Sequence, residues 1–364
     1  MTLASVEQIA NAVERIAPLP LAEEWDNCGL QAGDPAAQAG RVLVALTPLP
    51  EVFEEAEEKE ADFLLFHHPL IFRPLESIVT SSYPGDLLAR SIRKGLAVYA
   101  AHTSYDAAPA GVSVALANAI GLHGPLRVLS PRGTLRKLVI FVPGENVDTV
   151  AEALAGAGAG VIGDYTECTF RTWGTGTFRG GDEARPYLGE KGRLEKVEEV
   201  RIETVIPAHA VRRAVDAATA AHPYEEVALD VYPVEGRPEG CGYGRVGALP
   251  EHLGAEELRD HVSESLGLPS RLVADSGRRI ETVAVLGGSG GSFIPEVARS
   301  DAHAYVTGDI GYHDALLADS LGLSVIDAGH AATELPSLEP LARRLADLVE
   351  VPVEVSISAG QRFG

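Results

Sequence analysis

The chain contains few basic residues and few cysteines. Its 364 residues include 30 lysines and arginines against 52 aspartates and glutamates, which gives a formal net charge of −22 at pH 7. Because proteins bind nucleic-acid phosphates through lysine and arginine, this balance argues against a nucleic-acid partner. The three cysteines, Cys28, Cys168 and Cys241, are widely spaced and form no CxxC pair. We therefore expect free thiols, and neither a disulfide framework nor a thiolate metal site.

The sequence also lacks long hydrophobic runs. No window approaches the roughly 18 apolar residues that a membrane span needs, and the first residues do not form a basic segment followed by an apolar core. We therefore expect a cytoplasmic protein without a membrane partner. The overall composition, 46% hydrophobic and 23% charged, is that of a globular protein, and the length allows two domains or one domain with an insertion.

Strands that alternate with helices are predicted at both ends of the chain. The N-terminal strands are expected at 42–46, 63–66 and 96–100, with helices at about 51–60 and 86–94. The C-terminal strands are expected at 282–286, 304–307 and 324–327, with helices at 293–299 and 313–321. Apolar strands separated by helices are typical of parallel sheets covered on both faces. Both ends therefore predict an α/β fold.

The two ends share a second pattern after the third strand. Residues 95–99 lead to His102 and, four residues later, Asp106, whereas residues 322–326 lead to His330 and, four residues later, Glu334. A histidine and an acid with the same spacing, after matched strands, predict two related α/β halves that form one domain.

The middle of the chain has a different pattern. Its elements are predicted at 138–142, 147–155, 165–178 with a turn at 174–176, 199–205, 210–221 and 227–234. The order βαββαβ is typical of a ferredoxin-like α+β domain. We therefore predict a discontinuous α/β domain, residues 1–129 and 237–364, interrupted by an inserted domain, residues 130–236.

The sharpest local feature is a pair of adjacent histidines after an apolar strand. His67 and His68 follow residues 63–66 and precede Pro69. Ligands bind at the carboxyl ends of strands in open α/β sheets. Neighbouring residues on a strand point to opposite faces, so both histidines reach one site only if the strand ends there, and Pro69 supplies that end. Alone, the pair would be more typical of a buried hydrogen-bond network than of a metal site.

Further candidate ligands follow the carboxyl ends of other predicted strands. Because such ends lie along one edge of a parallel sheet, we expect Asp106, His330 and Glu334 to meet His67 and His68 there. Three imidazoles and two carboxylates exceed what one tetrahedral zinc with an open position requires. A mixed nitrogen and oxygen set suits zinc, iron or manganese. We therefore predict a site for two divalent metal ions, with a carboxylate bridging them.

Several motifs together carry a family resemblance. They are Glu24-Trp25-Asp26-Asn27-Cys28-Gly29-Leu30, Phe66-His67-His68-Pro69, His102-Thr103-Ser104-Tyr105-Asp106-Ala107-Ala108-Pro109, Gly242-Tyr243-Gly244-Arg245-Val246-Gly247, Gly287-Gly288-Ser289-Gly290, Thr307-Gly308-Asp309, Gly329-His330 and Thr333-Glu334. With these segments the chain resembles the GTP cyclohydrolase 1 type 2 homologs, also called Nif-three-like proteins.

The resemblance implies a dinuclear metal site and an assembly. His68 and Asp106 would hold one ion, His67 and His330 the other, and Glu334 would bridge them. It also implies a toroidal homohexamer with the metal sites facing an internal cavity, and an insertion similar to PII-type or CutA-like domains.

Three further residues are weaker candidates for a catalytic role. His102 could orient a ligand or a water molecule, or simply cap a helix. Asp309 stands where relatives commonly have a glutamate, so its shorter side chain reaches less far. His313 could contact substrate or lie on the surface. The glycine turn at 287–291 could present N–H groups to a phosphate or permit close packing.

Two functions are compatible with these features. The first is a metal-dependent hydrolase acting on a small anionic ligand, either nucleotide-like or otherwise phosphorylated, since paired metals suit hydrolysis. The alternative is a metal-binding regulatory or metal-chaperone protein without turnover, which the PII/CutA-like insertion favours.

Overall fold

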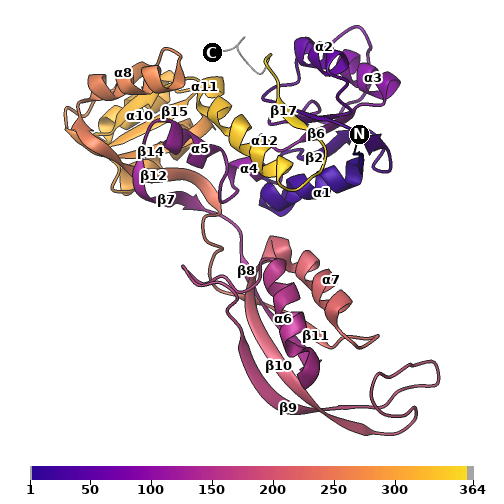
Figure 1. Cartoon of the computed structure of the whole chain (residues 1–364). Helices are drawn as coiled ribbons and strands as arrows, with labels where there is room; N and C mark the ends of the chain where they lie inside the picture. Colours follow the sequence, from indigo (N-terminus) through magenta and orange to yellow (C-terminus); the bar gives the residue numbers. More distant parts are fainter. Residues whose placement is uncertain (1, 359–364) are drawn as a thin grey trace. The chain divides into compact units, whose positions relative to one another are not determined.

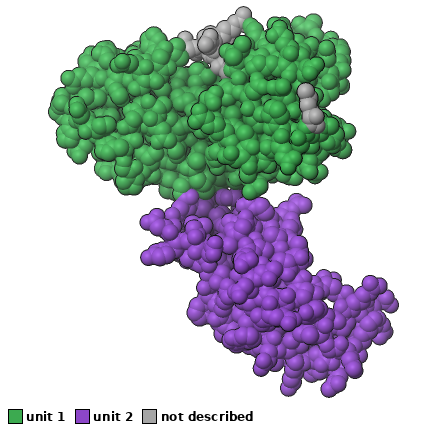
Figure 2. Space-filling view, viewed as in Figure 1, with its two compact units in different colours: residues 1–131, 240–364 green, residues 132–239 purple. Residues whose placement is uncertain are grey.

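The computed structural model describes residues 2–358 (Figure 1). The chain forms two compact units, one made of residues 1–131 and 240–364 and the other of residues 132–239 (Figure 2). No helix within residues 2–358 is long and apolar enough to cross a bilayer.

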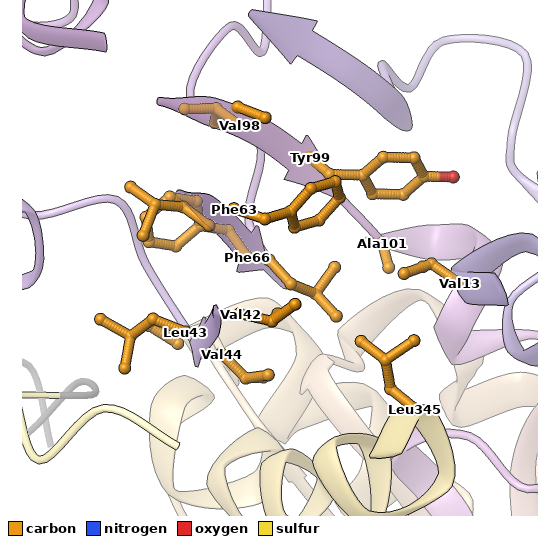
Figure 3. Close-up of a cluster of buried hydrophobic side chains, with 14 of the residues drawn as sticks. Val13, Val42, Leu43, Val44, Phe63, Phe66, Val98, Tyr99, Ala101 and Leu345 are labelled. Carbon is orange, nitrogen blue, oxygen red and sulfur yellow. The ribbon is translucent and has the colours of Figure 1, made fainter. Parts of the chain in front are cut away.

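The first unit contains a five-stranded sheet built around three fully buried parallel strands. Its order is β17 (Val353–Val355), β4 (Val42–Ala45), β5 (Phe63–Phe66), β6 (Ala97–Ala100) and β2 (Gly29–Ala32), of which only β2 runs antiparallel to its neighbour. The helices of this half are α1 (Val6–Ile16), α2 (Pro50–Glu58), α3 (Gly85–Lys94) and α12 (Leu338–Ala346), and two short strands, β1 (Ala4–Ser5) and β3 (Gln38–Ala39), pair with each other. Figure 3 shows Val13 of α1 and Leu345 of α12 beside the apolar side chains of the strands.

A second sheet in the same unit repeats this arrangement. Its order is β13 (Arg271–Ala274), β16 (Ser324–Asp327), β15 (Ala304–Gly308), β14 (Ile280–Ser289), β12 (Gly242–Leu253) and β7 (His123–Pro131). Strands β14, β15 and β16 are parallel, as β4, β5 and β6 are, and β13 is an antiparallel edge strand like β2. The helices of this half are α5 (Val112–Ala119), α8 (Ala255–Leu266), α9 (Ile294–Arg299) and α10 (Tyr312–Ser320). The predicted α/β fold is confirmed.

The expectation that all candidate ligands lie along the edge of one sheet is wrong. The third strand of each half is followed by a short helix, α4 (Thr103–Asp106) after β6 and α11 (His330–Glu334) after β16. Strand β16, however, belongs to the second sheet, so the candidate residues do not share one sheet edge. Each half forms a separate sheet, and the residues that follow the strand ends of both sheets meet at one site.

The second unit is a four-stranded antiparallel sheet with two helices. The strand order is β11 (Leu229–Val234), β8 (Leu135–Pro143), β10 (Glu195–Pro207) and β9 (Phe170–Phe178), and the helices are α6 (Val147–Gly156) and α7 (Val211–Ala221). The predicted turn at 174–176 is wrong, because Gly174 and Gly176 lie inside β9 and pair with Glu199 and Val197. Gly176 serves packing instead, since a Cβ there would collide with the Glu199 carboxylate.

Candidate metal centre

Glu334 lies at the centre of the predicted ligand cluster. Its Oε1 is 3.1 Å from Nε2 of His330 and 3.4 Å from Nε2 of His67, while its Oε2 is 3.1 Å from Nε2 of His68. Oδ1 of Asp106 is 3.7 Å from Nε2 of His67. The structure therefore brings together all five residues that the sequence singled out as ligands.

The end of strand β5 explains why two adjacent histidines reach one site. The backbone N–H groups of His67 and His68 still donate to the carbonyls of Ala45 and Leu46. Hydrogen bonding to strand β4 and to the residue that follows it therefore continues just past β5. The strand itself ends at Phe66, before the histidines. Their ring centroids lie 5.1 Å apart, so the alternation of a regular strand no longer separates them.

Helix α11 and a glycine turn place the remaining ligands. His330 and Glu334 lie four residues apart on α11 and therefore share one helix face. A Cβ at Gly288 would collide with the Glu334 carboxylate, and Gly288 has a left-handed φ of 72°. Close packing against the ligands thus accounts for glycine at this position.

The second ring nitrogen of each histidine is held by another group. Nδ1 of His67 bonds to the carbonyl of Ala101 at 3.1 Å, Nδ1 of His68 to Oγ1 of Thr47 at 2.9 Å, and Nδ1 of His330 to Oδ2 of Asp309 at 2.7 Å. Such partners fix the orientation of metal-binding histidines in proteins. All three rings consequently present Nε2 to the cluster.

Unpaired buried atoms test whether these residues fit a metal. Nε2 of His67, Nε2 of His68, Oδ1 of Asp106 and Oε2 of Glu334 are buried and make no hydrogen bond of regular geometry within residues 2–358, although Nε2 of His68 and Oε2 of Glu334 lie only 3.1 Å apart. Buried polar atoms are normally paired. Because Nδ1 of His67 faces a carbonyl oxygen and must carry the proton, its Nε2 offers a lone pair in the neutral ring. The nitrogen and oxygen donors of this cluster fit divalent metal ions.

His102 lies beside this cluster. A ring nitrogen of His102 lies within 4.8 Å of ring nitrogens of His67 and His68, close enough for the three to hold a metal ion together. Nδ1 of His102 bonds to Oδ1 of the buried Asp26 at 2.9 Å. Burial alone would raise the pKa of Asp26, but hydrogen bonds from His102 and Thr103 outweigh it and hold the pKa well below its usual range. Asp26 therefore stays charged and orients His102.

Opposite charges shift the pKa values inside the cluster. Burial opposes a charged ring at His67, but the Glu334 and Asp106 carboxylates raise the pKa of His67 to about 9. Burial likewise opposes charge at His330, where Glu334 and Asp309 raise the pKa to about 9. Burial raises the pKa of Asp106 to about 6. Without metal, protons on the two histidines thus balance the buried carboxylates.

Of the other two weaker candidates, Asp309 lies beside the cluster and His313 does not. Asp309 forms a hydrogen bond with His330, so its role is to orient a candidate metal ligand rather than to contact substrate directly. His313 is exposed on α10, and its ring contacts Tyr312 at 5.4 Å. Nothing in the described part of the chain brings His313 to the five-residue cluster.

Sequence reasoning missed some supporting residues of the cluster. Thr47 has no motif that would reveal its bond to His68, since it follows β4, a neighbouring strand. Asp26 belongs to the motif at residues 24–30, which the sequence did single out, but its bond to His102 could not be read from the sequence.

Replacing Asp309 by asparagine should weaken metal binding by about 10- to 100-fold, the usual effect of losing a partner that orients a metal-bound histidine. Asparagine tolerates the left-handed φ of 56° at this position, so the backbone should not change. Competition with a chelator measures the affinity. The exposed Asp319→Asn variant is the control, and equal affinities for the two variants would refute the role of Asp309.

Comparisons with known proteins match almost the whole chain. The family model Duf34/NIF3 (NGG1p interacting factor 3) matches residues 4–362. A Bacillus subtilis protein named GTP cyclohydrolase 1 type 2 homolog is 42% identical over 345 residues, which cover 94% of this chain and 92% of that protein. The crystal structure of a Bacillus cereus protein related to NIF3 is 39% identical, covers 100% of both chains and has a TM-score of 0.86. That of Staphylococcus aureus protein SA1388 is 28% identical, covers 99% of this chain and 98% of that one, and has a TM-score of 0.72. The chain therefore belongs to the Duf34/NIF3 family, in agreement with the resemblance found in its motifs.

Proposed function

We propose that this protein binds two divalent metal ions and hydrolyses a nucleotide-like or otherwise phosphorylated small molecule. The observation that carries the proposal is the buried cluster of three imidazoles and two carboxylates with unpaired donor atoms. As the family resemblance implies, His68 and Asp106 would hold one ion, His67 and His330 the other, and Glu334 would bridge them.

The contacts of Glu334 support this pairing of ligands. Its Oε1 lies 3.4 Å from Nε2 of His67 and 3.1 Å from Nε2 of His330, while its Oε2 lies 3.1 Å from Nε2 of His68. The two oxygens thus face histidines assigned to different ions, so this carboxylate is suited to bridge them. Donor atoms of His68, His330 and Glu334 lie within 4.8 Å of one another, so the two ions would be close neighbours.

A pair of zinc, iron or manganese ions would polarise a phosphoryl or carbonyl oxygen and activate water near neutral pH. The chain itself supplies a group for proton transfer. His102 lies beside the ligands, and Asp26 fixes its ring through Nδ1, so Nε2 is free to exchange a proton with substrate or water.

Two exposed aromatic side chains near the cluster support a substrate with a planar ring. Trp25 is 60% exposed and Phe72 is 45% exposed, and each ring centroid lies 6.3 Å from that of His102. Exposed aromatic rings are suited to stack on bases. The name of the Bacillus subtilis relative, GTP cyclohydrolase 1 type 2 homolog, also points to a nucleotide.

Turnover of a panel of nucleotides and phosphodiesters by metal-loaded protein tests the hydrolase. We expect hydrolysis by the wild type and its loss in His68→Ala, whereas the exposed His252→Ala should keep wild-type rates. Equal rates in wild type and His68→Ala would refute the hydrolase. Bound metal without turnover on any substrate would favour the regulatory or metal-chaperone alternative.

Replacing Trp25 by alanine should raise KM for nucleotides by about tenfold, because a stacking partner for the base is lost. Metal content and the kinetics of a phosphodiester without an aromatic ring should not change, since Trp25 is not among the candidate ligands. Steady-state kinetics on both substrates measures the difference. An equal change on both would show that Trp25 supports the fold rather than the ring of the substrate.

We further propose that the second unit is a ferredoxin-like insertion and that the protein forms a homohexamer. The element order β8-α6-β9-β10-α7-β11 and the strand order β11-β8-β10-β9 support the first proposal. The second rests on the family resemblance alone. Light scattering of the purified protein should give six times the mass of 38.4 kDa.

A further inference from the structure

The second unit contains a cavity that the metal centre does not explain. Its volume is about 420 Å³, within the range of small-molecule sites. The lining includes aromatic rings from several elements together with three carboxylates, and its main members are Phe178, Tyr187, Glu199, Tyr224, Glu225 and Glu226. All of them belong to residues 132–239.

The cavity carries negative charge that no basic side chain neutralises. Glu199, Glu225 and Glu226 line it, and none of the lining residues is a lysine or arginine. No ion pair within residues 2–358 joins a lysine or arginine to these three carboxylates. Burial lowers the pKa of His222, which packs against Tyr224, so this ring adds no charge at neutral pH. The lining therefore favours a cation and repels an anion.

Hydrogen bonds hold the two tyrosine rings of the cavity in place. The Tyr187 hydroxyl donates to Oε1 of Glu145 at 2.8 Å, and the Tyr224 hydroxyl donates to Oε1 of Glu199 at 2.9 Å. The ring centroids lie 6.1 Å apart with an interplanar angle of 48°. Because the hydroxyls are engaged, the rings offer their faces, which attract both apolar groups and cations.

A glycine makes room for the central carboxylate. The Glu199 side chain lies where a Cβ at Gly176 would stand on the paired strand β9. Any other residue at this position would displace the carboxylate from the cavity wall. The backbone N–H of Arg185 also bonds Oε1 of Glu225 at 2.5 Å, which fixes a second carboxylate.

We propose that this cavity binds a small organic cation, a protonated amine on an apolar or aromatic body. The ammonium group would face Glu199 and Glu225, and the body would lie against Tyr187 and Tyr224. Carboxylates beside aromatic faces are the chemistry that recognises such a ligand. The site does not depend on the metal centre, because none of its residues belongs to that cluster.

Calorimetric titration of the full-length protein with three probes of similar shape tests the charge requirement. We expect 2-phenylethylammonium to bind, neutral 2-phenylethanol to bind about tenfold more weakly, and anionic 3-phenylpropanoate not to bind, because only the first can pair with the carboxylates. Failure of the ammonium probe to bind at millimolar concentration would overturn the proposal. Equal binding of the anion would do the same.

Variants of neighbouring glutamates locate the site. Glu199→Gln should weaken binding of 2-phenylethylammonium by about tenfold, since one charge is lost. Glu198→Gln should leave it unchanged, because Glu198 is the next residue on β10 and points to the opposite face of the sheet. If Glu199→Gln does not fold, the exposed Glu225→Gln should show the same loss. Equal affinities in all variants would show that the probe does not bind in this cavity.

Discussion

Replacing Glu334 by glutamine should lower metal affinity by more than about 100-fold and leave fewer than one ion bound per chain. The effect should exceed the 10- to 100-fold loss typical of removing a residue that only orients a ligand. Glu334 touches His67, His68 and His330 through its two oxygens. Glutamine keeps the shape of the side chain but removes the charge and one of the two oxygen donors. Elemental analysis after dialysis against metal, together with chelator competition, measures the loss.

The control for this substitution is Glu339→Gln on the next helix. Glu339 is exposed, and within residues 2–358 it pairs only with Arg343, at 3.9 Å, so its loss should change neither metal content nor affinity. Thermal unfolding of the metal-free proteins checks that both variants fold. If Glu334→Gln bound two ions with wild-type affinity, Glu334 would not be a metal ligand.

Metal affinity should rise steeply with pH between about 6 and 8.5. The pKa values of His67 and His330 are raised to about 9, so both rings carry a proton at neutral pH when metal is absent. A metal ion can bind Nε2 only after this proton leaves. The affinity should therefore increase about tenfold per pH unit for each proton that an ion displaces.

Titration calorimetry in two buffers of different ionisation enthalpy counts the released protons. At pH 7 we expect about two protons per two bound ions, one from each histidine. A phosphate-free buffer and zinc concentrations below its hydroxide solubility keep the measurement free of precipitation. Proton release near zero, or an affinity that does not change with pH, would contradict the assignment of these histidines.

The same pKa shifts determine whether the metal-free protein gains or loses stability as the pH rises. A histidine whose pKa is raised by folding stabilises the fold most below its ordinary pKa of 6.5, and this contribution is lost as pH rises through about 9. The pKa of Glu334 is lowered, so its charged carboxylate stabilises the fold at neutral pH, and this contribution is lost at acidic pH. Metal-free protein should therefore lose stability toward pH 9, while metal-loaded protein should lose less, since bound metal replaces the protons.

The strands and helices near the site could be predicted because their sequence patterns are local. Residues 63–66 form strand β5 as the apolar run predicts, and the helix expected at 86–94 is α3, Gly85–Lys94. The expectation that all ligands share one sheet edge was wrong, because β16 lies in another sheet. Which sheet a strand joins depends on packing between distant segments, and hydrophobic periodicity does not report this.

Polar contacts between residues far apart in the chain could not be predicted from the sequence either. Arg245 is buried and donates to five backbone carbonyls, those of Ala108, Pro109, Gly240, Gly242 and Gly244. It thereby ties the chain just after Asp106 to strand β12. A buried arginine without a carboxylate has no sequence signature, because its partners are backbone groups that every residue carries. The same holds for Ala101, whose carbonyl orients His67.

Metal content of the native protein tests the central claim most directly. Elemental analysis of protein purified without added metal or chelator should find about two divalent ions per chain, since the five ligands exceed the needs of one zinc ion. The same value should return after metal removal and incubation with zinc, manganese or iron. No bound metal after that incubation, or the same content in a variant that lacks His68, would contradict the assignment of this cluster as a dinuclear metal centre.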